Sequence, residues 1–298
     1  MCIRDSPHCG ARLQGRTPLR WLKIAAVILA VGGLGGLWLL ATNAEIPRVR
    51  NDQVSGMMNM AYVRIEGRVS RGPNYNPDSQ TLTFHVTDES GEELMVSAFR
   101  SQAARLIEQG RIPALEDHVA VAGNLRVRED FTGLTLNAPD QLQITRPEPE
   151  PARLGDLTLL DIGRRVRVRG LVRQVRSPYE GLTLITVLDD GGRPVDIAVS
   201  QALELLTGPL PVLSPGQGLE AIAAVTAYRD TVQLVPATTA DLIPVADLGG
   251  LNLERPIGTL SSADAGRWVL VRGEIVETDP FGSGIRFTLD DGSGRVTL

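Results

Sequence analysis

Arginine is concentrated in one short segment of this chain. Six of the thirteen residues from Arg164 to Arg176 are arginines, and guanidinium groups bind phosphates and carboxylates through paired hydrogen bonds. The alternation of Arg with Val puts the arginines of the first half on one strand face. The segment could hold phosphates or another acidic partner, or it could be a solvated face that acidic neighbours neutralise. Its candidate ligand-binding residues are Arg165, Arg167, Arg169, Arg173 and Arg176.

Three aromatic residues stand beside prolines at comparable places in the chain. They lie in the sequences Pro73-Asn-Tyr75, Pro178-Tyr179 and Pro280-Phe281. An exposed ring on a rigid turn can stack on a nucleobase, which contributes about 1–3 kcal/mol per base. Each ring could instead cap the end of its own domain. Tyr75, Tyr179 and Phe281 therefore join the arginines as candidate ligand-binding residues.

The histidines and the acidic pairs do not indicate catalysis. His8, His85 and His118 fit surface positions, and the pairs at 189–190 and 290–291 lie where hairpin turns require Asp and Gly. The chain contains no phosphate-binding loop and no Gly-x-Ser-x-Gly nucleophile motif. We therefore expect a protein that is not an enzyme, with no metal ligands and no cofactor.

The charge of the chain is unevenly distributed. Residues 1–50 hold seven Lys and Arg against two Asp and Glu, so 23 basic and 33 acidic residues remain for 51–298, a net charge of −10. A negative field of this size disfavours strong non-specific binding to duplex nucleic acid. Any contact with nucleic acid must therefore be local.

A repeat of 103 residues positions these candidates. Strand-like segments end at Gly67, Gly170 and Gly273, which are 103 residues apart in both intervals. Each is followed by a loop, a second strand and an acidic turn, at 84–91, 186–192 and 287–294. The glycine suits a sharp bend in a long first strand.

Further elements follow in the first two copies. We expect short helices at 100–109 and 200–206, then strand pairs at 118–127 with 134–136 and at 219–227 with 231–235. The order is strand, strand, strand, helix, strand, strand. Pro-rich residues 146–152 and looser residues 244–255 read as linkers between the copies.

This layout resembles the OB-fold family of five-stranded β-barrels. The segments 266–276 and 287–294 look particularly like its nucleic-acid-binding branch, which includes tRNA anticodon-binding domains. The resemblance implies an all-β fold with short helices, in tandem modules at 58–146, 154–246 and 257–298, the last one truncated. It also implies a ligand surface on strands 2 and 3 and on the loops joining strands 1–2 and 4–5.

The N-terminal region predicts a membrane anchor. Residues 21–42 form an apolar run long enough to span a bilayer as a helix, and the basic residues before it place the N-terminus in the cytoplasm and the modules outside. A cleaved signal peptide is the alternative. Residues 1–6, MCIRDS, look like translated sequencing adapter. In the tail 7–20, Pro7-His8-Cys9-Gly10 resembles half of a zinc ribbon but lacks the other cysteine ligands.

Three functions fit these observations. The first is a membrane-anchored, non-enzymatic protein that binds single-stranded nucleic acid or another oligomeric ligand. The second is an interaction scaffold whose partners are proteins of the cell envelope. The third follows from a resemblance in topology to the haem chaperone of cytochrome c maturation, but the histidine that this family uses has no counterpart in 137–147.

Overall fold

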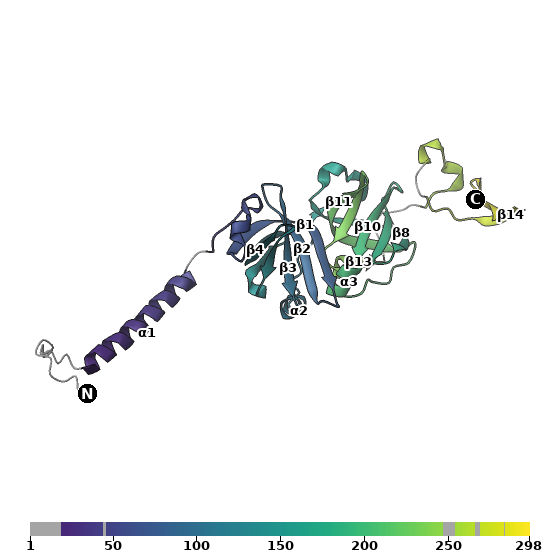
Figure 1. Cartoon of the computed structure of the whole chain (residues 1–298). Helices are drawn as coiled ribbons and strands as arrows, with labels where there is room; N and C mark the ends of the chain where they lie inside the picture. The colour runs from purple at the N-terminus through teal and green to yellow at the C-terminus, as the bar shows by residue number, and fades with distance from the viewer. Residues whose placement is uncertain (1–18, 44–45, 247–253, 266–268, 283) are drawn as a thin grey trace, which may run out of the picture. The chain divides into compact units, whose positions relative to one another are not determined.

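A computed structural model describes residues 19–43, 46–246, 254–265, 269–282 and 284–298 (Figure 1). The chain divides into two compact units, 1–46 and 47–298. Most of the tail that resembles a zinc ribbon, and all of residues 1–6, lie outside the described residues. The first unit contains helix α1, Leu19–Asn43, whose apolar stretch Trp21–Leu40 is long enough to cross a membrane.

The second unit opens with a closed five-stranded barrel. Its strands wrap in the order β1-β2-β3-β5-β4, and β4 returns to pair with β1. Its elements are β1 (Tyr62–Asn76), β2 (Thr81–Thr87), β3 (Glu93–Phe99), α2 (Ser101–Glu108), β4 (His118–Arg128), β5 (Phe131–Leu136) and β6 (Leu142–Thr145). The helix between the third and fourth strands and the parallel pairing of β3 with β5 complete the expected OB arrangement.

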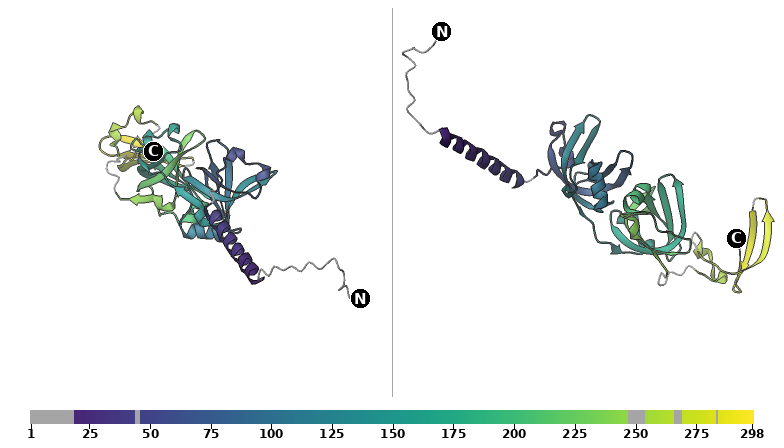
Figure 2. Two further views of the ribbon diagram at one scale, coloured as in Figure 1. Left: turned by 90° about the vertical axis from the view of Figure 1, so that its left-hand side faces the viewer. Right: turned by 90° about the horizontal axis from the view of Figure 1, so that it is seen from below.

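A second barrel repeats this order. β11 pairs with β8 and closes it, and β10 runs parallel to β12. Its elements are β7 (Glu150–Pro151), β8 (Arg165–Tyr179), β9 (Leu182–Leu188), β10 (Pro194–Ser200), α3 (Gln201–Thr207), β11 (Gly218–Tyr228), β12 (Thr231–Pro236) and β13 (Leu242–Val245). Figure 2 shows the strands of each barrel curling around its own centre. The prediction of an all-β fold with tandem barrels is confirmed.

The third copy contributes a three-stranded antiparallel sheet in the described residues. Its strands are β14 (Glu274–Phe281), β15 (Gly284–Asp290) and β16 (Arg295–Thr297). Short 3-10 turns accompany the three copies, at Asn51–Gln53, Gly56–Met58, Pro139–Gln141, Leu154–Asp156, Leu159–Asp161, Thr239–Asp241, Ile257–Thr259 and Ser262–Asp264.

The repeated glycine marks the point where the first strand changes neighbours. β1 pairs with β4 from Tyr62 to Arg68 and with β2 from Arg68 onwards. A Cβ atom built on Gly67 would lie 2.5 Å from the carbonyl oxygen of Thr87 in β2. The equivalent atom on Gly170 would lie 2.3 Å from a Val187 methyl carbon, so a side chain is excluded at both crossings.

Alternation along the strands supplies the two cores. In β1, Val63, Ile65 and Val69 point inward and are fully buried. In β8, Val166 and Val168 do the same for the second barrel. The intervening residues of each strand therefore face outward, and this alternation positions the arginines described below.

A short extended segment precedes the first strand of each copy and pairs in parallel with that strand or, in the third copy, with Leu270 ahead of β14. Arg48 bridges to Arg64 in the first copy, β7 pairs with β8 in the second, and Glu254 bridges to Leu270 in the third. The Pro-rich residues expected to form a linker are therefore partly a strand of the second barrel. The repeating unit begins earlier than the sequence pattern indicated.

Candidate ligand-binding groove

Three of the arginines predicted from the sequence, Arg167, Arg169 and Arg176, have exposed side chains on β8 that are held by carboxylates. Arg167 and Arg169 donate to the two carboxylate oxygens of Glu220 in β11, at 2.9 and 2.7 Å. Hydrogen bonds from Arg169 and Arg167 lower the pKa of Glu220, because they favour its charged form. Arg176 makes a similar bond of 3.0 Å to Asp196 in β10.

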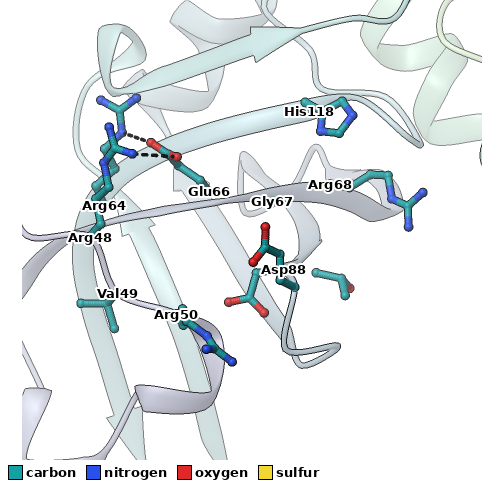
Figure 3. Close-up of a pocket in the computed structure, with 11 residues that line it drawn as sticks. Arg48, Val49, Arg50, Arg64, Glu66, Gly67, Arg68, Asp88 and His118 are labelled. Carbon is teal, nitrogen blue, oxygen red and sulfur yellow. Dashed lines mark hydrogen bonds and ion pairs between the residues drawn. The ribbon is translucent and has the colours of Figure 1, made fainter.

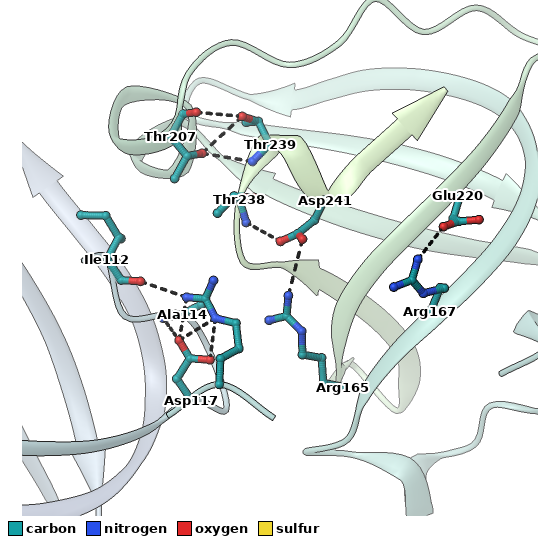
Figure 4. A network of polar contacts seen from close by, with 11 residues as sticks. Ile112, Ala114, Asp117, Arg165, Arg167, Thr207, Glu220, Thr238, Thr239 and Asp241 are labelled. Atoms are coloured by element: carbon teal, nitrogen blue, oxygen red, sulfur yellow. Dashed lines mark hydrogen bonds and ion pairs between the residues drawn. The ribbon is translucent and has the colours of Figure 1, made fainter. Parts of the chain in front are cut away.

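Arg165 differs from its neighbours because its side chain is only 9% exposed. Burial lowers the pKa of this guanidinium, and its Nη2 atom lies 3.5 Å from Asp241 (Figure 4). A tighter pair lies in the first barrel, where Arg146 donates to both oxygens of the buried Asp117, at 2.9 and 2.8 Å. Arg165 therefore occupies a structural position.

The β8 surface is thus cross-linked by ion pairs. Arg173, on the same strand, also interacts with another group. These contacts favour the reading in which the arginine face is neutralised by its acidic neighbours. A ligand would have to compete with Glu220, Asp196 and Asp241 for the guanidinium groups. Ligand binding by these arginines stays a prediction.

The three predicted rings have different environments. Tyr75 is half-buried and packs against the first core. Tyr179, at the end of β8, is 65% exposed and is the ring best placed to stack on a ligand. Phe281 lies across its own hairpin, over the backbone of Gly284, with the guanidinium of Arg286 5.4 Å from its ring centre.

A groove on the first barrel was not predicted from the sequence. It has a volume of about 730 Å³ and lies over β3, β4 and β5 beside the loop that joins β1 to β2. Two aromatic rings, three guanidinium groups and several hydroxyls line it: Ser79, Thr81, Ser97, Phe99, Arg100, Arg126, Arg128, Phe131, Gly133, Leu134 and Thr135. It overlaps in part, through β3 and the residues next to the two loops, with the surface that the OB resemblance implies for ligands.

The two rings of this groove are accessible. Phe99, the last residue of β3, is 45% exposed, and Phe131, the first residue of β5, is 37% exposed. A Cβ atom on Gly133 would lie 2.7 Å from the Phe131 ring. Gly133 therefore gives the ring room to lie against the sheet with its other face toward solvent.

The arginines of the groove contrast with those of β8. Within the described residues, no ion pair or side-chain hydrogen bond engages Arg100, Arg126 or Arg128, and their charge is available to a ligand. Arg100 has φ 46° and ψ −113°, a conformation that costs non-glycine residues free energy. Its backbone N–H donates to the carbonyl of Gln80, which also has a positive φ of 52°. Such strain is typical of functional sites.

The second barrel does not repeat this charge. From the strand registers, Thr226 and Tyr228 occupy the positions of Arg126 and Arg128. Tyr228 is exposed and carries the guanidinium of the next residue, Arg229, 5.3 Å from its ring centre. Of the two described barrels, only the first therefore has this basic groove.

A second cleft of the first barrel, about 570 Å³ in volume, is lined by four arginines and three carboxylates (Figure 3). Arg48 and Arg64 both donate to Glu66, and Asp88 and Glu89 complete an acidic side of the lining. The three carboxylates offset most of this positive charge, so the cleft attracts a polyanion less than the groove with three arginines and no carboxylate does. In the described ranges, no three His, Cys, Asp or Glu side chains lie close enough together to bind a metal ion.

Comparisons with known proteins identify structural neighbours only. No family model matches the chain, and no curated protein matches it. A replication protein A heterotrimer bound to single-stranded DNA is 11% identical, with 84% of this chain and 80% of that chain covered and a TM-score of 0.32.

Two further structures show similarly distant likeness. A murine DNA-binding protein bound with double-stranded DNA is 14% identical, with 62% and 97% covered and a TM-score of 0.25. An OBody bound to hen egg-white lysozyme is 12% identical, with 35% and 97% covered and a TM-score of 0.28. Likeness at this level carries no argument about ligands, so the assignment of this chain as an all-β protein of tandem OB-type barrels rests on its own strand order and closure.

Proposed function

We propose that this chain is a membrane-anchored, non-enzymatic protein that binds single-stranded nucleic acid in the groove of its first barrel. The observation that carries the proposal is the combination of three arginines without ionic partners in the described residues and two exposed phenylalanines in one groove. The groove supplies both the charge and the stacking surfaces that single strands require.

The chemistry of the groove favours unpaired bases. Phe99 and Phe131 offer ring faces that can stack on any base, whereas the bases of a duplex are already stacked on one another. Arg126 and Arg128, at the end of β4, supply positive charge for the phosphates between those bases. Because residues 51–298 carry a net charge of −10, most of their surface repels a polyanion, and attraction of a nucleic acid is limited to this groove.

The test is binding of a fluorescent oligothymidylate to the full chain in detergent, at about 50 and 200 mM salt. Three phosphate contacts predict a loss of affinity of roughly 20-fold between these salts, because each contributes about −0.7 to the single-strand slope. The double change Arg126→Ala with Arg128→Ala should remove most of this salt dependence. Phe131→Ala should weaken binding by about 1–3 kcal/mol at both salts.

Arg167→Ala is the matched control, because it also deletes one surface guanidinium but one that is paired with Glu220. We expect it to leave affinity and salt slope unchanged. Equal losses in Arg167→Ala and in the groove variants would contradict the assignment of the groove. Binding that is absent at both salts would contradict the proposed function itself.

The anchor is the second part of the proposal. The length and composition of α1 support a transmembrane span, and the basic residues that precede it support an orientation with the barrels outside the cytoplasm. Digestion of intact cells or spheroplasts with a protease tests the orientation. Protection of the barrels until the membrane is broken would contradict it.

A further inference from the structure

The turn that leads into the first barrel exposes large apolar side chains. Met57 is 97% exposed and Met60 is 60% exposed, while Met58 between them packs against the core. Tyr62, at the start of β1, adds a ring that is 38% exposed. Such a group of exposed apolar side chains is a candidate interaction site.

This turn is held firmly by the barrel. The backbone N–H of Met60 donates to the carbonyl of Leu125 at 2.9 Å, and the side chain of Asn124 donates to the carbonyl of Met60 at 3.2 Å. The side chain of Asn59 accepts the backbone N–H of Val127 at 3.1 Å. The side chains that fix the turn are thus neutral amides, which cost less than charged groups to bring to a lipid headgroup layer.

Met60 also keeps an unfavourable backbone conformation. Its φ is 69°, in the left-handed region, where the second copy has Gly163 at the equivalent position 103 residues later. Leu160, the equivalent of Met57, is 95% exposed. An exposed apolar side chain at the tip of this turn is therefore a feature of both complete barrels, and no packing contact explains it.

The covalent chain limits how far this barrel can be from the anchor. The carbonyl of Pro47 accepts the N–H of Arg64 in β1, so the barrel is tied to the chain from residue 47 onwards. Only residues 44–46 separate Pro47 from the end of α1 at Asn43, and four peptide steps span at most about 14 Å. If α1 spans a bilayer, this short covalent tether limits how far Pro47 can lie from the bilayer surface.

We propose that Met57 and Met60 insert into the lipid interface of the bilayer that holds α1. Flexible thioether side chains and a neighbouring tyrosine suit this boundary, where apolar groups enter the acyl region and polar groups stay hydrated. The proposal depends on α1 being embedded in a bilayer and is independent of nucleic-acid binding.

The test uses the full chain, with Cys2→Ser and Cys9→Ser, in phosphatidylcholine vesicles that contain brominated lipid. A fluorophore on Ser55→Cys reports on the turn while both methionines remain, and one on Gln109→Cys, exposed at the end of α2, reports on the same barrel elsewhere. We expect brominated lipid to reduce emission at position 55 at least about twofold and to leave position 109 nearly unchanged.

The Met57→Asp variant distinguishes insertion of the turn into lipid from mere closeness of the turn to the bilayer. At 97% exposure this change cannot disturb the core, yet it should abolish the quenching at position 55, because a carboxylate resists entry into lipid. Equal quenching at 55 and 109, quenching that survives Met57→Asp, or a chain that does not float with the vesicles would each overturn the proposal.

Discussion

The crossing glycine of the first barrel provides a sharp test of how these barrels close. In Gly67→Ala, the new Cβ would lie 2.5 Å from the Thr87 carbonyl oxygen, 2.8 Å from a Val86 methyl carbon and 3.0 Å from the Thr87 carbonyl carbon. Two of these three atoms belong to the backbone of β2. The strand must therefore move by nearly 1 Å, since no side-chain rotation relieves the contact.

The expected cost follows from this geometry. Moving β2 away weakens the pairing of Arg68 with Thr87 and opens the core beneath Val86, which is fully buried. Overpacking with a backbone shift costs about 1–3 kcal/mol, and the damaged strand pair adds to it, so we expect a loss of about 2–4 kcal/mol in the free energy of unfolding.

Gly72→Ala is the matched control. Gly72 lies on the same strand, and no atom lies within 4 Å of the Cβ that it would gain. Native-state hydrogen exchange, followed by mass spectrometry on peptides of β1 and β4, measures the loss in the first barrel, and peptides of β8 and β11 serve as an internal reference. A Gly67→Ala protein as stable as Gly72→Ala would refute the argument that the crossing excludes a side chain.

Two further predictions concern stability. Met60→Gly should stabilise the first barrel by about 0.5–1 kcal/mol. The free-energy cost of a left-handed backbone conformation for methionine exceeds the cost of ordering the more flexible glycine backbone on folding. Urea denaturation measures the gain, and the reverse change Gly163→Met should reduce stability. The pKa of Glu220 is lowered from its ordinary value of 4.5, so its pairs with Arg167 and Arg169 contribute stability that is fully present above pH 4.5 and is lost as pH falls below that value. Urea midpoints of the second barrel between pH 7 and pH 3 should thus converge with those of Glu220→Gln, and a constant difference across this range would contradict the assignment.

Much of the fold could be predicted because its determinants are local. The alternation in β1 and β8, the acidic turns and the spacing of the glycines each depend on a few neighbouring residues, and the observed β12, Thr231–Pro236, differs from the expected strand by one residue. The segment ahead of each barrel was missed because two or three extended residues carry no period that a sequence pattern can reveal.

The candidate site was less predictable because its partners are remote in sequence. The arginines of β8 were visible as a cluster, but Glu220, which pairs with two of them, lies more than fifty positions away. The groove unites Arg100 with Arg126 and Phe131 only once β3, β4 and β5 have closed into a barrel. A local signal existed in the alternation of Arg126 with Arg128 before Phe131, at the predicted loop between strands 4 and 5.

The segment that joins the two barrels has a consequence for how such a protein can change in length. β6 ends at Thr145, Arg146 is fastened to Asp117, and β7 begins at Glu150, which leaves only Pro147, Glu148 and Pro149 outside both barrels. A deletion there would have to break a buried ion pair or pull β7 from its neighbour β8. Fluorescent proteins or affinity tags are better tolerated in the turn at Arg229 and Asp230 of the second barrel, where both residues are exposed.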